Sequence, residues 1–348
     1  MRTNALSTLS FWSAPRTGVA RMQADIARGN EELVTGRFAD VGLVLGSRAG
    51  ITVGLRQKSA ELAALRDGNA GTALRLSTSQ AALKQMQETA DTALKTLTGL
   101  PEDKRAGALK AMAANQLAGL TGLLNTSVDG QFVFGGTNTG RAPMTAYTAS
   151  PAAPAKAAVD AAFLKAFGVT QESAGAGTIT ADALSAFLDG PFQDLFDDAS
   201  WAADWSGAGT APLTSQISLT ETVQSSASAN APAFRKLAMA YVMASDLGAS
   251  NLSAAAQAVL GDRVAKGLSE ASGGLVALQA DLGRSQAAIT AANTRLDAQK
   301  SLFANQIGQM EGVDTAEAKT RVDRLSTQVQ ISYALTAQLR QLSLVAYI

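Results

Sequence analysis

The sequence predicts a mainly α-helical protein. Its N- and C-terminal regions are expected to form a long antiparallel bundle or coiled coil, with a small mixed α/β insert domain at the tip. Large apolar residues recur every seven positions near both ends of the 348-residue chain, and the central part lacks this repeat. Aromatic residues make up only 5% of the chain. Hydrophobic residues make up 47% of it, and alanine is the commonest of them. Such a chain buries its area through long, thin helix contacts rather than through an aromatic core.

The most regular stretch is the C-terminal quarter, where one narrow apolar seam repeats with a period of seven residues. This period keeps one stripe facing a partner helix, because it corresponds to 3.5 residues per turn. An unbroken helix over residues 253–311 would be about 85 Å long, so it needs a partner along its length. The seam residues are Leu268, Leu275, Leu282, Ile289, Leu296 and Phe303.

The N-terminal third predicts three further helices. Residues 16–35 have apolar residues at helical spacing, and Gly36 marks the end, because glycine accepts the left-handed conformation. Residues 38–50 contain several glycines and are expected to form a loop. A long helix over residues 51–99 shows the seven-residue repeat, and a helix over residues 101–128 follows it. The seam of the long helix contains Leu55, Leu62, Asn69, Leu76 and Leu83.

One position of this second seam, Asn69, is polar. If Asn69 is buried, it lowers stability but penalises other helix registers. Alternatively, it faces solvent where the seam drifts away from the partner. The sequence leaves both interpretations open.

The pattern changes at residue 129, where a turn, a short apolar strand and a glycine-rich turn are expected. The following residues are irregular, with a short strand predicted at Ile179–Thr180 and a short helix over residues 181–188. A small core is expected from Phe192, Leu195, Phe196, Trp201 and Trp205. The predicted division is terminal assembly helices at 1–45 and 312–348, a helical rod at 46–136 and 232–311, and an insert domain at 137–231.

Composition argues against several classes of function. The net charge is zero, so no basic field attracts nucleic acid. The chain has neither cysteine nor histidine, which removes disulfides, thiolate chemistry and the commonest general base and metal ligand. No apolar run reaches the roughly 18 residues of a membrane span. We therefore expect no enzyme activity, no cofactor and no metal.

Two local patterns resemble ligand sites without completing them. Residues 135–142 follow a strand as a phosphate loop does, but Arg141 and Ala142 replace the lysine and the Ser/Thr that hold phosphate and magnesium. An acidic cluster in the insert lacks calcium-loop spacing and indicates a solvated surface. Its members are Asp194, Asp197, Asp198 and Asp204. A lysine- or carboxylate-based site in the insert is left open.

Both chain ends favour an assembled protein. The N-terminus lacks the apolar core and cleavage site of a secretory signal, so export would need another route. Residues 322–348 are apolar and almost uncharged, and such an end requires cover from other segments or subunits. The residues alone therefore predict a subunit whose ends become ordered when packed.

Four stretches near the two ends of the chain form a recognisable series, at residues 32–37, 67–83, 312–317 and 339–348. They resemble stretches of flagellins and their relatives. Their order and their position at both ends are typical of that family, although no single motif is specific. The loop that follows the first helix in the family is replaced here by residues 38–44. The segment 131–139, with Phe134, Gly135, Gly136 and Thr137, is similar to the turn of hook–filament junction proteins, the hook-associated protein 3 family.

This resemblance implies a structural protein that is exported unfolded through the flagellar type III apparatus without a cleaved signal. It implies an extracellular adaptor ring that joins the hook, through a neighbouring hook-associated protein, to the flagellin filament. The implied partners are further copies of the chain, that other junction protein, flagellin and an export chaperone. The residues implied in assembly contacts are Leu6, Leu9, Leu335, Leu339, Leu342 and Val345.

Two alternatives stay open at this point. A filament flagellin would share the terminal helices, but the Phe134 turn and the short insert argue against it. A soluble helical signalling domain would also be alanine-rich and heptad-patterned, but it would not need an apolar terminal tail.

Overall fold

The computed structural model describes residues 8–100, 102–149 and 153–345. The chain divides into two compact units, residues 1–63 with 296–348 and residues 64–295. Long helices dominate both units, and short helices and two-stranded sheets complete the described part. The predicted fold class, mainly α with a small mixed insert, is confirmed.

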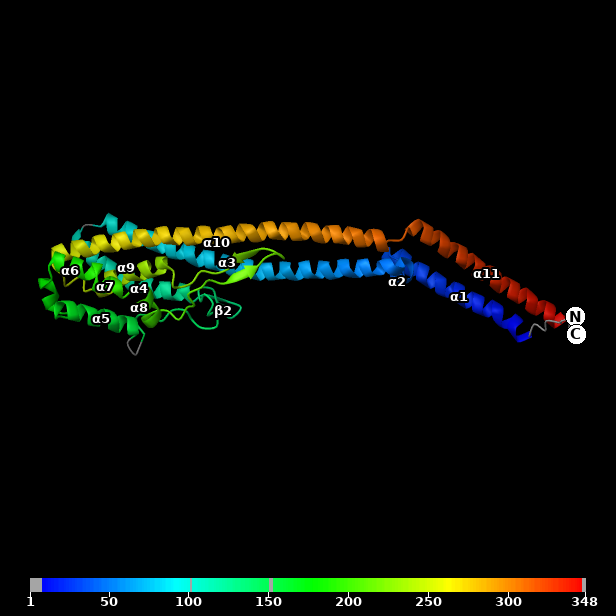
Figure 1. The fold of residues 1–348 in the computed structure, drawn as a ribbon, viewed down its shortest axis with the longest axis horizontal. Coiled ribbons are helices and arrows are strands. Elements are labelled where there is room, and N and C mark those ends of the chain that lie inside the picture. Colours follow the sequence, from blue (N-terminus) through cyan, green and yellow to red (C-terminus); the bar gives the residue numbers. More distant parts are fainter. Residues whose placement is uncertain (1–7, 101, 150–152, 346–348) are drawn as a thin grey trace. The chain divides into compact units, whose positions relative to one another are not determined.

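The first unit contains a pair of long helices, α1 (Thr8–Thr35) and α11 (Thr315–Val345), that lie side by side (Figure 1). The helix α1 begins at Thr8 rather than at the predicted residue 16, and it ends at the predicted residue, where Gly36 takes a left-handed φ of 66°. The helix α10 begins one residue later than predicted and ends as predicted. The elements of this unit are α1 (Thr8–Thr35), α2 (Val41–Leu45), the 3-10 turn η1 (Gly46–Arg48), the first turns of α3 (Ala49–Gly99), the last turns of α10 (Ala254–Glu311), and α11 (Thr315–Val345).

The loop predicted for residues 38–50 is wrong, because α2 and η1 occupy most of it. The physical reason is a side-chain cap. The Asp40 carboxylate accepts a hydrogen bond from the Leu43 amide at 2.8 Å, which satisfies a free donor at the start of α2. This local bond offsets the low helix propensity of the glycines.

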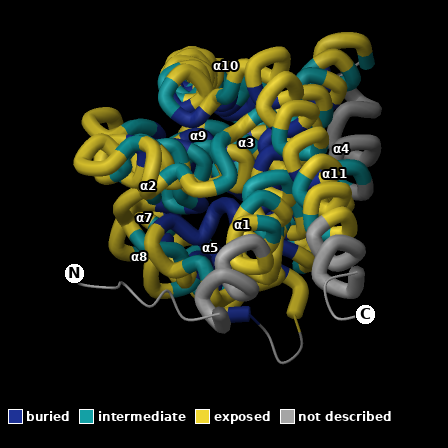
Figure 2. The backbone as a smooth tube through the Cα atoms, turned by 90° about the vertical axis from the view of Figure 1, so that its right-hand side faces the viewer, coloured by how far each residue is buried: buried dark blue, intermediate teal, exposed yellow. Residues whose placement is uncertain are grey.

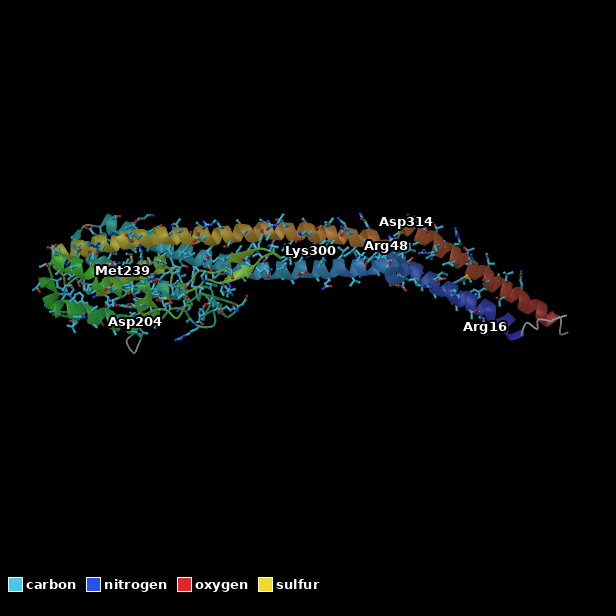
Figure 3. All side chains as sticks on the ribbon, viewed as in Figure 1. Arg16, Arg48, Asp204, Met239, Lys300 and Asp314 are labelled. Carbon is cyan, nitrogen blue, oxygen red and sulfur yellow. The ribbon has the colours of Figure 1, made fainter. Side chains whose placement is uncertain are left out.

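Two short connections of the first unit meet. Arg37, between α1 and α2, forms an antiparallel bridge with Gly312, between α10 and α11. Asp314, labelled in Figure 3, then caps α11 by accepting a hydrogen bond from the Ala316 amide at 2.8 Å. The bridge and the cap define where α10 stops and α11 begins.

The second unit is built on the remaining parts of α3 and α10, with α4 and α9 packed against each other. Glycines of α10 admit α9 closely, because a Cβ at Gly274 would lie 2.8 Å from the Ala233 Cβ. The helix predicted over residues 101–128 ends earlier, since residues 127–128 form a strand. The two helices introduced here are α4 (Glu102–Leu124) and α9 (Pro232–Asp246).

A two-stranded hairpin follows α4. Ser127 pairs with Phe132, and the turn between the strands has positive φ at Asp129 (51°) and Gly130 (74°). Two successive left-handed residues are the geometry of a tight hairpin turn that matches strand twist. The strands are β1 (Ser127–Val128) and β2 (Gln131–Phe132).

The rest of the insert consists of short helices and a second hairpin. The strand predicted at Ile179–Thr180 is wrong, because the Thr180 hydroxyl accepts a hydrogen bond from the Ala183 amide at 3.2 Å and starts a helix there. The elements are α5 (Pro154–Phe167), the 3-10 turn η2 (Ala174–Thr178), α6 (Ala181–Asp189), α7 (Pro191–Asp194), α8 (Asp198–Asp204), β3 (Thr214–Gln216) and β4 (Thr222–Gln224).

One buried apolar cluster runs through the helices and the insert of the second unit. It includes Leu83 of α3, Phe163 of α5, Trp201 of α8 and Leu275 of α10. Figure 2 marks its residues in dark blue. The predicted small core is part of this cluster, with Leu195 packed at its edge.

Candidate assembly interface

The helices α1 and α11 approach each other closely. Gly29 of α1 faces Val322 of α11, and a Cβ at position 29 would overlap the Val322 Cγ2 atom. Farther along the pair, the Gln23 side-chain amide donates a hydrogen bond to the Tyr333 hydroxyl at 3.0 Å. A side chain at position 29 would force the Val322 side chain to move, so glycine allows this close approach and indicates a defined register of the pair.

One predicted assembly residue has a described side chain. Leu335 is 54% exposed, and Ile331, one helical turn earlier, is 53% exposed. By helical spacing both lie away from the buried stripe of α11, which consists of Ala318, Val322 and Val329. Leu6 lies outside the described residues, and so do the side chains of Leu9, Leu339, Leu342 and Val345. Their assembly role therefore stays a prediction.

Further exposed apolar residues of the first unit were missed by the sequence reasoning. Val34 is 87% exposed and Leu43 is 73% exposed. Val53, at the start of α3, lies outside the seven-residue register of that helix, whereas Ile51 falls on its companion row with Leu65 and is exposed all the same. The other exposed members are Val44, Leu302 and Tyr333. Figure 2 draws much of α1 and α11 in yellow, the colour of exposed residues of every kind. Where exposed residues are large and apolar, they mark contacts with other chains.

The predicted seam residues differ in burial between the units. In the first unit Leu62 and Leu296 are buried, whereas Leu55 and Phe303 are half-buried. In the second unit the following are buried: Asn69, Leu76, Leu83, Leu268, Leu275, Leu282 and Ile289.

Asn69 is buried rather than solvent-facing. Its side-chain amide donates hydrogen bonds to Asn293 Oδ1 at 2.8 Å and to the Ile217 carbonyl oxygen at 2.9 Å. Asn293 belongs to α10, and Ile217 follows β3 in the second hairpin. The polar seam position therefore cross-links α3, α10 and the hairpin, and it fixes their register.

The glycine-rich turn is packed rather than open. Phe134 is buried with its ring edge-on to Phe234, at 5.5 Å between centroids and 80° between planes. The Gly135 carbonyl accepts a hydrogen bond from the Gly209 amide at 2.9 Å. Gly136 has a φ of 58°, and a Cβ there would collide with backbone carbonyl oxygens. Thr137 is exposed at the end of the turn. The contacts of Gly135 and Gly136 hold the turn against the chain around residue 209.

Two acidic residues of the insert, Asp197 and Asp198, make local contacts within the fold. The Asp197 carboxylate accepts a hydrogen bond from the Ser200 amide at 2.7 Å and caps α8, and bonding by Ser200 lowers the pKa of that carboxyl. Asp198 pairs with Arg235 at 2.8 Å. Among the described residues, no group of acidic side chains is placed to hold a metal ion. No helix in the described ranges is long and apolar enough to cross a membrane.

Long helices with a fixed register and exposed apolar residues define a structural protein that acts through contacts with other chains. Residues 6–139 match the bacterial flagellin N-terminal helical region, and residues 266–348 match the bacterial flagellin C-terminal helical region. Together these regions cover more than half of the chain. The chain belongs to the flagellin family and is a structural component of the bacterial flagellum. A comparison with curated proteins finds no match.

Family membership excludes the signalling-domain alternative. It implies an extracellular flagellar component that leaves the cell by type III export and assembles into a flagellar polymer. Both matched regions are flagellin regions, so they do not distinguish one position within the flagellum from another.

Proposed function

We propose that this chain forms the adaptor ring between the hook and the flagellin filament. The observation that carries the proposal is the segment 131–139, whose Phe134–Thr137 turn is similar to that of hook–filament junction proteins. The packing of Phe134 and Gly136 gives a physical reason for this sequence, because other residues would not fit.

The proposed partners follow from this position. Copies of the chain would contact one another in the ring, the neighbouring hook-associated protein would bind on the hook side, and flagellin would bind on the filament side. An export chaperone is proposed for the chain before assembly. The exposed residues Ile331 and Leu335 of α11 support a role for this helix in such contacts.

A filament flagellin is the second candidate. The observation that favours it is the match of both terminal regions to bacterial flagellin. In that case the chain would make up the filament itself, and its copy number per flagellum would be far higher than that of a ring.

Deletion of the gene distinguishes the two candidates. For a junction protein, electron microscopy should show hooks without filaments, and immunoblots should show flagellin shed into the medium. Hooks that still bear full filaments would contradict the junction role. Loss of filaments without external flagellin would favour the filament protein. Restoring the intact gene serves as the control.

A further inference from the structure

The two connections of the first unit are tied together by their main chains. The Phe38 amide donates a hydrogen bond to the Glu311 carbonyl oxygen at 3.0 Å, and the Val313 amide donates one to the Gly36 carbonyl oxygen at 3.1 Å. One bond joins the connection between α1 and α2 to the last residue of α10, and the other joins it to the connection between α10 and α11. Opening one connection therefore breaks hydrogen bonds of the other.

A buried carboxylate lies at this crossing. Glu311, the last residue of α10, is 0% exposed, and its Oε2 accepts a hydrogen bond from Arg56 Nη2 of α3 at 2.5 Å. The Arg37 guanidinium lies 4.0 Å from the same oxygen. Both arginine side chains are about half exposed, so surface cations hold a buried anion. A carboxylate withdrawn from water needs such partners, because an unpaired buried charge is costly.

A second carboxylate holds the same connection from the other helix pair. Glu32 of α1 is 8% exposed, and its Oε1 accepts a hydrogen bond from the Ala39 amide at 3.3 Å. Its other oxygen forms an ion pair with Arg321 of α11. The segment 36–39 is therefore held by one buried carboxylate of α1 and one of α10, and their arginines come from α11, α3 and the segment itself.

We propose that these groups form a single conformational joint, which we name the carboxylate joint (Glu32, Arg37, Arg56, Glu311 and Arg321). The joint makes α1 and α11 change direction together, relative to the adjoining ends of α3 and α10 within the first unit. With both carboxylates in place, neither α1 nor α11 bends alone. Loss of either carboxylate frees the two connections from each other.

Hydrogen exchange on the full chain tests the coupling. In Glu311→Gln the amides of Phe38 and Val313 should both exchange about tenfold faster, since the buried ion pair that holds the crossing is lost. Glu317→Gln, an exposed acid on α11, is the matched control and should leave both amides unchanged. Faster exchange at only one of the two amides would overturn the coupling.

A distance measurement tests the mechanical consequence. The chain has no cysteine, so spin labels can be attached at Ser301→Cys on α10 and Gln328→Cys on α11, which are both exposed. Double electron–electron resonance should give one narrow distribution of the distance between the two labels, and this distribution should broaden in Glu32→Gln. The neighbouring exposed acid, Glu31→Gln, should not broaden it. Equal widths in all these proteins would overturn the role of the carboxylate.

A further variant covers the case in which Glu311→Gln does not fold. Arg56→Met keeps the apolar stem of a side chain that is 50% exposed and removes only its guanidinium. Far-UV circular dichroism should show unchanged helix, and the distance distribution should broaden. An unchanged distribution in this folded variant would overturn the proposed joint.

Discussion

Replacing Asn69 with alanine is expected to lower the free energy of unfolding of the second unit by about 2–4 kcal/mol. The substitution removes the donor of two hydrogen bonds, to the Ile217 carbonyl at 2.9 Å and to Asn293 Oδ1 at 2.8 Å. Ile217 is 1% exposed, so bulk solvent does not reach its carbonyl in the folded protein. A buried polar atom left without a partner costs about 1–3 kcal/mol, and Asn293 adds less because it is only partly buried.

Urea unfolding followed by tryptophan fluorescence measures this change. In a Trp12→Phe background the remaining tryptophans, Trp201 and Trp205, both belong to the second unit and report on its unfolding alone. The control is Asn115→Ala on α4, where the side chain is exposed and the change should stay within about 0.5 kcal/mol.

A double-mutant cycle separates the hydrogen bond between the helices from the general cost of the substitution. Asn69→Ala, Asn293→Ala and the double variant should give a coupling energy of about 1 kcal/mol, because the first change removes the partner of the second. A coupling energy near zero, or an Asn69→Ala protein as stable as the control, would refute the cross-link argument.

Three further predictions follow. Gly136→Ala should destabilise the second unit by about 2–4 kcal/mol in the same assay, because its φ of 58° and the nearby carbonyl oxygens exclude a Cβ. Leu335→Glu should keep the helix content but abolish assembly of the chain into the flagellum in cells, whereas Gln330→Glu, the same charge on another face of α11, should retain it. Burial raises the pKa of Tyr241, and burial with a neighbouring carboxylate raises that of Tyr147. Above about pH 10 only the unfolded chain then ionises these two phenols, so they leave the free energy of unfolding unchanged below that pH. Above it, each phenol should lower the free energy of unfolding by about 1.4 kcal/mol per pH unit. In a series of unfolding curves at different pH, Tyr241→Phe should remove half of the slope that the two phenols cause.

The long helices could be predicted from sequence because a single local rule determines them. Apolar residues recur every seven positions, which is every two helical turns. The predicted span of 253–311 differs from α10 by one residue at its start. The failures occurred where a single side chain changed the outcome. Asp40 caps the start of α2 and Thr180 caps the start of α6, and in both cases one side-chain oxygen accepts a hydrogen bond from a backbone amide. The glycines before α3 and the β-branched residues at 179–180 had indicated a loop and a strand instead of these helix starts.

The environment of Asn69 shows a different limit. The sequence indicated a polar residue in an apolar seam but left burial and exposure equally possible. Its two acceptors, Ile217 and Asn293, are far away along the chain, and neither forms a motif with Asn69. The carboxylate joint was equally hard to predict, because Glu311 and Arg56 belong to no sequence motif and meet only in the folded protein. Such contacts depend on tertiary structure, so a local pattern cannot reveal them.

The charge and the exposed surface together favour an assembled state. The net charge is zero, so free copies lack the mutual repulsion that keeps soluble monomers apart. In the first unit, Val34 and Leu43 present apolar surface at 87% and 73% exposure, and Leu335 adds more. A chain of this kind self-associates unless a partner covers those residues. Exposed apolar residues on a neutral chain are thus a liability for a free monomer, and they become contact area once a neighbouring subunit or a chaperone binds them.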